Sequence, residues 1–148
     1  MANQEHFILI KQGVEIWNSW REENPKNHPD LSGADLQEAD LQGINLENAN
    51  LKETILFDVN FQGANLQHAD LQQANLYEAN LTRADLRGAN LLKADGLTRF
   101  HFENVIFDET TKVPDYVELT KKEEPEFPKI WIFLTAAILT IVVFFILR

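Results

Sequence analysis

The chain contains thirteen consecutive five-residue units between residues 31 and 91, each centred on a bulky apolar residue. From the second unit on, alanine lies two residues before the centre in nine of twelve cases, and Asp or Asn lies one residue before it in eleven of twelve. A fixed short period indicates a repeat architecture, which has to be settled before any local helix or strand is predicted. The centres are Leu31, Leu36, Leu41, Leu46, Leu51, Leu56, Phe61, Leu66, Leu71, Leu76, Leu81, Leu86 and Leu91.

A period of five fits neither an α-helix nor a flat strand. On a helix, centres five residues apart are rotated by about 140° and scatter around the axis. On a strand, an odd period places successive centres on opposite faces. The centres share one interior only if the chain turns a corner in every unit. We therefore expect a solenoid with the centres and alanines inside, and with the short Asp and Asn side chains bonded to the corner backbone.

The tandem motif A-[D/N]-L-x-x over residues 31–95 resembles the pentapeptide-repeat family. The segments at 17–21 (WNSWR) and 107–115 (FDETTKVPD) are similar to the entry and exit segments of cyanobacterial members. The resemblance implies an all-β solenoid: a right-handed quadrilateral β-helix of about four coils, with four units per coil. All the centres except Leu31 are expected to form its structural core, together with alanines that fill the remaining space.

We divide the chain into four segments. Residues 1–30 are expected to form an amphipathic capping helix and an entry loop, and residues 31–111 the β-helix. Residues 112–129 are expected to form a charged, proline-containing stalk, and residues 130–147 a transmembrane helix. Both ends of a solenoid need a cover, because each coil buries its interior only against its neighbours.

The two covers are predicted from apolar spacing. Between residue 5 and about residue 21, apolar side chains at helical spacing predict one amphipathic helix over the N-terminal end. Its two tryptophans leave membrane-interface binding as an alternative. At the other end, Gly96 shifts the phase by one residue, after which Leu97, Phe102 and Phe107 resume the spacing of five. With Phe100 and Val105 at the alanine position, we expect a final coil filled by aromatic side chains.

Ile130–Leu147 contains eighteen residues without a charge, glycine or proline. As a helix it would extend about 27 Å, enough for the hydrocarbon core of a bilayer. We predict a single tail-anchoring transmembrane helix, without an N-terminal signal peptide. The lysines that precede the span favour a cytoplasmic N-terminal domain. The sequence does not distinguish the plasma membrane from a thylakoid membrane.

The charge and the residue types restrict the chemistry. The net charge of −10 argues against direct nucleic acid binding, which needs clustered Lys and Arg. There are no cysteines, and the four histidines are not spaced as metal ligands. We therefore predict a non-enzymatic protein with no catalytic residue, no metal, no cofactor and no small-molecule substrate.

Four units per coil place residues twenty positions apart on one face. Phe57 and Tyr77 then share an outward column with Gln37, and Ile55 lies beside Phe57. Because aromatic residues are enriched at interfaces, this face is the predicted partner surface. The alternative is that it packs against the chain's own stalk or N-terminal arm. Its residues are Ile55, Phe57 and Tyr77, bordered by the stacked acids Glu38, Asp58 and Glu78. Those acids could also hold a divalent cation, although exposed carboxylates of this kind are usually only solvated.

These observations predict a membrane-anchored scaffold that presents a rigid surface to a protein partner. The resemblance adds an alternative, because some pentapeptide-repeat proteins resemble DNA in size and charge and bind type II topoisomerases. A weaker alternative is regulation of an adjacent membrane enzyme or transporter through the second half of the transmembrane helix.

Overall fold

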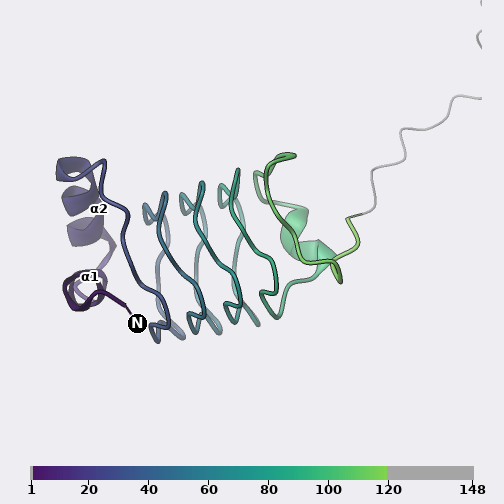
Figure 1. Ribbon diagram of the computed structural model, residues 1–148, viewed down its shortest axis with the longest axis horizontal. Coiled ribbons are helices and arrows are strands. Elements are labelled where there is room, and N and C mark those ends of the chain that lie inside the picture. The colour runs from purple at the N-terminus through teal and green to yellow at the C-terminus, as the bar shows by residue number, and fades with distance from the viewer. Residues whose placement is uncertain (1, 120–148) are drawn as a thin grey trace, which may run out of the picture.

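The computed structural model describes residues 2–119. The predicted transmembrane helix Ile130–Leu147 and most of the predicted stalk lie outside these residues. Two short helices, α1 (Gln4–Ile10) and α2 (Val14–Glu23), lie at one end of a stack of coils, and a 3₁₀ helix, η1 (Arg99–Phe102), lies at the other (Figure 1). In the described part of the chain, no helix has the length and apolarity needed to cross a membrane.

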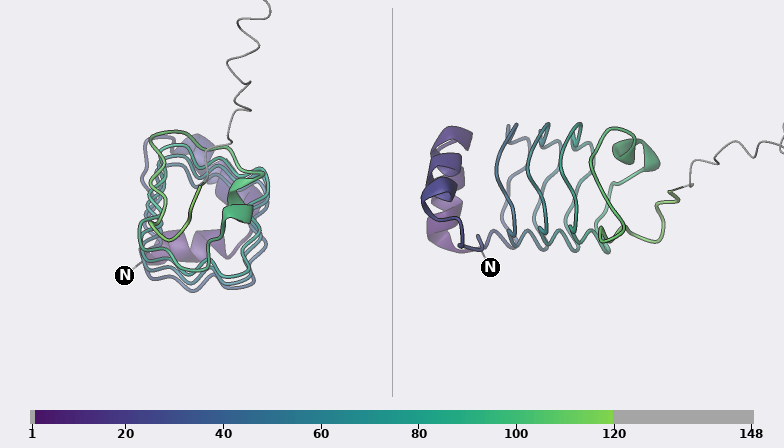
Figure 2. Two further views of the ribbon diagram at one scale, coloured as in Figure 1. Left: turned by 90° about the vertical axis from the view of Figure 1, so that its right-hand side faces the viewer. Right: turned by 90° about the horizontal axis from the view of Figure 1, so that it is seen from above.

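The repeats form a four-sided solenoid. Parallel bridges join Asp30 to Asn50 and Asp35 to Ile55, and the same offset of twenty residues continues around the coil to the Asn45–Asn65 bridge. Viewed along the axis, the coils superimpose as a square (Figure 2). Four units per coil are therefore confirmed. The all-β expectation needs a correction, because the described residues contain isolated bridges and no extended strands. Each unit has a tight turn, which interrupts the ladder after a single bridge.

The local structure of each unit explains its sequence pattern. A turn begins at the centre, as in the first unit, where the Ala34 N–H donates to the Leu31 carbonyl at 3.0 Å. The third turn residue has a φ between 51° and 69° in all thirteen units, a left-handed conformation that is common in type II turns. The Asp or Asn before the centre accepts a hydrogen bond from the second turn residue, as Asp35 Oδ1 does from the Gln37 N–H at 3.1 Å. The predicted role of these short side chains at the corners is confirmed.

The interior is filled as predicted. All thirteen centres are buried, and Phe61 is the largest of them. The residues two positions before the centres also point inward, apart from the half-buried Ala39. Thr54 takes an alanine position and is fully buried, and its hydroxyl donates to the Leu51 carbonyl at 2.7 Å. A buried hydroxyl is tolerated there because the turn carbonyl satisfies it.

Two helices, rather than the single predicted helix, cover the N-terminal end. α1 ends at Ile10 and α2 begins at Val14, and between them Gly13 has a φ of 110° that no helix contains. Trp17 is fully buried, and its indole N–H donates to the Asn45 carbonyl at 2.7 Å. Arg21 donates to the Glu47 carbonyl at 3.0 Å. The two helices thus lie over the N-terminal end, and Trp17 is buried there and bonded to the first coil.

The C-terminal end differs from the predicted aromatic coil. Phe102 is buried and meets Phe107 edge-to-face at 5.5 Å, but Phe100 is 63% exposed and Phe107 is 40% exposed. Residues 99–102 form η1 instead of another five-residue unit. The next bridge pairs Asp85 with Ile106, which is twenty-one residues away instead of twenty. The expectation that Phe100 fills the interior is therefore wrong. The extra residue at the Gly96 phase shift lets the chain form a helical turn outside the coil.

The predicted boundary between the β-helix and the stalk, at residue 112, lies too early in the chain. Lys112 forms the last bridge, with Asn90, and its carbonyl accepts the Leu91 N–H at 2.8 Å. Pro114 and Val117 are buried beyond it. Residues 112–117 thus close the C-terminal end of the solenoid, because the last coil also needs a cover.

Candidate functional site

The six residues predicted as a partner surface lie on adjacent coils, and we call them the aromatic surface. The Asp58 N–H donates to the Tyr77 carbonyl at 2.9 Å, and the Glu38 N–H donates to the Phe57 carbonyl at 2.8 Å. These bonds hold the columns in register. Tyr77 is 55% exposed, Ile55 is 39% exposed and Phe57 is half-buried. The structure thus brings the three apolar residues to one face, as the offset of twenty requires.

Ile55 interrupts the corner chemistry at this face. It bridges Asp35 below and Asn75 above, and both of those neighbours use their side-chain oxygen to accept a turn N–H. An isoleucine has no oxygen for this bond, so its side chain gives up a stabilising local contact. In exchange it adds an apolar group to the surface beside Phe57.

The three acids of the aromatic surface are exposed and carry no cationic partner in the described residues. The two ion pairs found there join Lys52 to Asp70 at 3.1 Å and Arg87 to Asp85 at 2.6 Å. Glu38, Asp58 and Glu78 each occupy the left-handed turn position, with φ of 58°, 51° and 61°. They form a negatively charged border along the apolar residues. Within residues 2–119 no three His, Cys, Asp or Glu side chains gather as a metal site. The absence of a metal, a cofactor and a catalytic residue stays a prediction.

The described start of the predicted stalk reaches the edge of the aromatic surface without covering it. The Tyr116 hydroxyl donates to the Ala94 carbonyl and accepts the Leu97 N–H at 3.4 Å. Burial raises the pKa of Tyr116, and the nearby Asp95 and Tyr77 raise it further. Leu97 follows Gly96, which lies against the backbone of Tyr77, so Tyr116 lies near Tyr77. The Tyr77 side chain nevertheless stays exposed.

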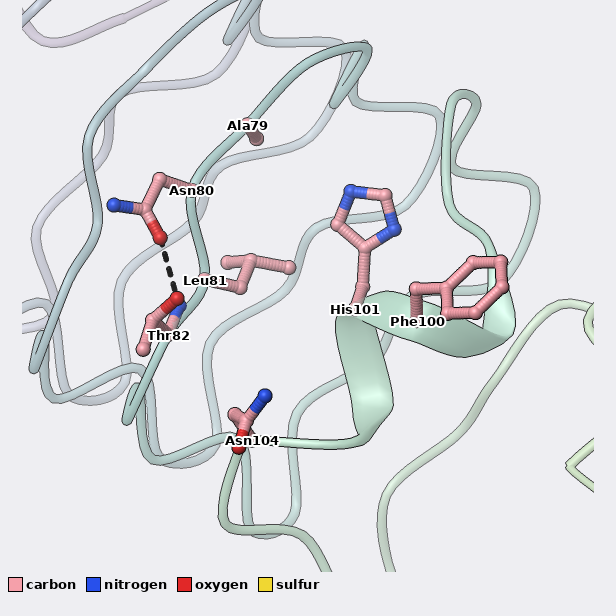
Figure 3. Close-up of a pocket in the computed structure, with 7 residues that line it drawn as sticks. All are labelled: Ala79, Asn80, Leu81, Thr82, Phe100, His101 and Asn104. Atoms are coloured by element: carbon pink, nitrogen blue, oxygen red, sulfur yellow. Dashed lines mark hydrogen bonds between the residues drawn. The ribbon is translucent and has the colours of Figure 1, made fainter.

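Sequence reasoning missed a cavity of about 180 Å³ at the C-terminal end. It lies between the segment 79–82 and η1, and Figure 3 shows the His101 ring directed from η1 toward that segment. Asn104 and Thr82 lie at its lower edge in this view. The step of six residues from Leu91 to Leu97, in place of five, could have indicated this cavity, because a displaced unit leaves the coil below it uncovered.

Comparison with protein families matches the repeat itself. Residues 30–56 and 54–91 match the model described as pentapeptide repeats, in eight copies. The match covers residues 30–91, the part of the chain that carries the five-residue period. The four-sided coils described above agree with the solenoid that this resemblance implies. No curated protein matches the chain.

Several solved pentapeptide-repeat proteins are similar to the chain. One from the thylakoid lumen of Arabidopsis thaliana is 30% identical over 53% of this chain and 58% of its own, with a TM-score of 0.43. One from the cyanobacterium Cyanothece 51142 is 39% identical over 56% of this chain and 59% of its own, with a TM-score of 0.34. A third, from Nostoc PCC 7120, is 26% identical over 72% of this chain and 88% of its own, with a TM-score of 0.31. The chain thus spans less than two thirds of the length of the first two.

Proposed function

We propose that the pentapeptide repeats form a non-enzymatic scaffold that presents the aromatic surface to a protein partner. The observation that supports this most is the exposure of Ile55 and Tyr77 on a face where most other units place polar residues. A solenoid is a stiff support, because each coil is bonded through its backbone to the next. A partner that binds it meets side chains that are already in place, which lowers the entropic cost of association.

The two kinds of residue in the aromatic surface have different roles in this proposal. Ile55, Phe57 and Tyr77 supply the apolar contact that gives most of the affinity. Glu38, Asp58 and Glu78 favour a partner with basic residues around an apolar centre, and mainly affect the rate and specificity of association. Binding is therefore expected to decrease only slightly as salt increases.

The proposal includes a position at a membrane. The support for this is the apolar sequence Ile130–Leu147, which would anchor the scaffold with its repeats on the cytoplasmic side. A scaffold held close to the bilayer meets membrane-bound partners at high effective concentration.

The decisive experiment compares partner capture by the full-length chain and by variants of the aromatic surface. Ile55→Asn restores the residue type found at most other corners, so it removes the apolar group and adds a turn acceptor. Tyr77→Ser removes the exposed ring. Gln67→Ser, on another side of the solenoid, is the matched control. We expect a protein captured by the parent and the control to be lost with Ile55→Asn and Tyr77→Ser, at unchanged thermal stability.

The same preparation tests the DNA-mimic alternative. In that alternative, the acidic side chains supply most of the binding free energy. Glu38→Gln, Asp58→Asn and Glu78→Gln would then abolish binding, whereas Tyr77→Ser would not. Binding would also decrease strongly with salt. A salt-sensitive effect on gyrase supercoiling that disappears in the acid variants would contradict the proposed scaffold role.

A further inference from the structure

Among residues 2–119, the segment 79–81 lacks the backbone hydrogen bonds that join the equivalent residues of the other units to the next coil, and we call this segment the open rung. In twelve of the thirteen units, the N–H of the centre donates to a carbonyl of the next coil. Leu76 does so to Asp95 at 2.9 Å, and Leu86 to Ile106 at 2.7 Å. Leu81 lies between them and is the exception. Among residues 2–119, no group accepts its N–H, and none donates to the carbonyl of Ala79.

The displacement of η1 explains the open rung. By the repeat, residue 100 should lie over Asn80 and bond to both of these groups. Instead, the Phe100 carbonyl accepts the Glu103 N–H at 3.3 Å within the helical turn. The turn is closed by a reciprocal cap, in which Thr98 N–H donates to His101 Nδ1 at 3.0 Å. These local bonds replace the ladder, so the chain passes outside the rung and leaves the cavity of about 180 Å³ in front of it.

The two unpaired groups define the chemistry that would fit. In the rest of the solenoid, a carbonyl and an N–H two residues apart are bonded by the N–H and the carbonyl of one extended residue. Asn75 is an example: its N–H donates to the Thr54 carbonyl at 3.0 Å, and its carbonyl accepts the Leu56 N–H at 2.9 Å. The open rung presents the same pair. Its cavity is smaller than the usual site for a drug-sized ligand, so it suits a single residue.

We propose that the open rung binds an extended peptide segment of a partner protein. One residue of that segment donates its N–H to the Ala79 carbonyl and accepts the Leu81 N–H, as an added strand does at a sheet edge. The His101 Nδ1 is occupied as an acceptor, so the neutral ring carries its proton on Nε2 and offers a further donor. Thr82 and Asn104 supply the polar rim. This site is distinct from the aromatic surface and does not depend on it.

Amide hydrogen exchange on the full-length chain in mild detergent tests whether the Leu81 N–H is unpaired. We expect the Leu81 amide to exchange at least a hundredfold faster than the amides of Leu71, Leu76, Leu86 and Leu91, whose N–H groups are bonded to the next coil. Equal protection of Leu81 would mean that the rung is already occupied and would overturn the proposal.

A peptide titration, followed by the NMR resonances of the backbone amides, tests whether the open rung binds an extended peptide. The probe is acetyl-Ala-Leu-Ala-amide, and the matched control is the same peptide with the leucine nitrogen methylated, which removes one N–H. We expect the probe to shift the Leu81 resonance and slow its exchange, and the control to bind at least fivefold more weakly. The Leu71 resonance, on a completed rung, should not move. Equal binding of both peptides would overturn the proposal. So would a Leu81 amide whose resonance and exchange rate change with neither peptide.

Discussion

Gly96 lies directly against the backbone of Tyr77. A Cβ at position 96 would approach the Tyr77 amide nitrogen to 2.3 Å and its Cα to 2.5 Å, and Gly96 has a φ of 85°. Only glycine fits both requirements, because it has no Cβ and adopts positive φ readily. The contact lies where the regular period is lost, so it places the start of the displaced C-terminal segment against the backbone of the aromatic surface.

Gly96→Ala is expected to destabilise the protein by about 2–3 kcal/mol, since the backbone must move and the φ is strained. Gly63→Ala is the control. It has a similar positive φ of 66°, but its Cβ would meet nothing within 4 Å. We expect a cost of about 1 kcal/mol there. Urea unfolding measures both, and equal losses would show that the close approach to Tyr77 does not matter.

Leu71→Asp is expected to unfold the solenoid, because it places a carboxylate in a dry interior. Gln72→Asp changes the neighbouring, half-buried turn residue to the same side chain and should cost less than about 1 kcal/mol. Circular dichroism and thermal unfolding compare the two. A similar loss of structure in both variants would contradict the assignment of inward and outward positions.

Trp17→Phe tests the N-terminal cover. It keeps an apolar ring but removes the donor to the Asn45 carbonyl, which would stay buried without this partner. We expect a loss of about 2–3 kcal/mol. Hydrogen exchange should increase first in the coil next to the helices, at residues 45–49. Ile16→Ala, on the exposed side of α2, is the control and should leave that protection unchanged.

Asp85→Asn tests an electrostatic contribution. The hydrogen bond from the Arg87 guanidinium lowers the pKa of Asp85, although partial burial opposes it. A lowered folded pKa gives stability above the unfolded value near 4 and loses it as the pH falls through the folded value. The asparagine still accepts the Arg87 backbone N–H. We therefore expect the parent's advantage over the variant to be small at pH 7, because the Arg87 side chain is half exposed, and to be smaller at pH 2. Urea unfolding at both pH values measures it, and an advantage that does not change with pH would contradict the expectation.

Removal of Ile130–Arg148 tests the membrane anchor. We expect the full-length chain to resist carbonate extraction, because an apolar helix of this length inserts favourably. The chain that ends at Lys129 should be extracted completely. In sealed vesicles, protease should reach the repeats from the cytoplasmic side only. A full-length chain that carbonate extracts completely would rule out the transmembrane prediction.

The sequence by itself determined the solenoid. Each unit contains its own corner, since the Asp or Asn, the centre and the left-handed turn residue interact within a few positions. Coils then stack only on their neighbours, so a pattern at a period of five already specifies which side chains are buried. Even the helical cover at the N-terminal end, in which Trp17 is buried, follows from apolar side chains at helical spacing.

The tertiary structure decided what happens where the period is lost. The aromatic residues after Gly96 fit the spacing of the interior, yet Phe100 turns outward because the Thr98–His101 cap satisfies that segment locally. Gly13, with a φ of 110°, divides the predicted single helix into α1 and α2. The exposure of Tyr77 and the unpaired Leu81 N–H also depend on segments that are far apart along the chain. The spacing of residues within a few positions predicts the repeat. The structure at the two ends of the solenoid depends on packing between distant segments, which no local pattern predicts.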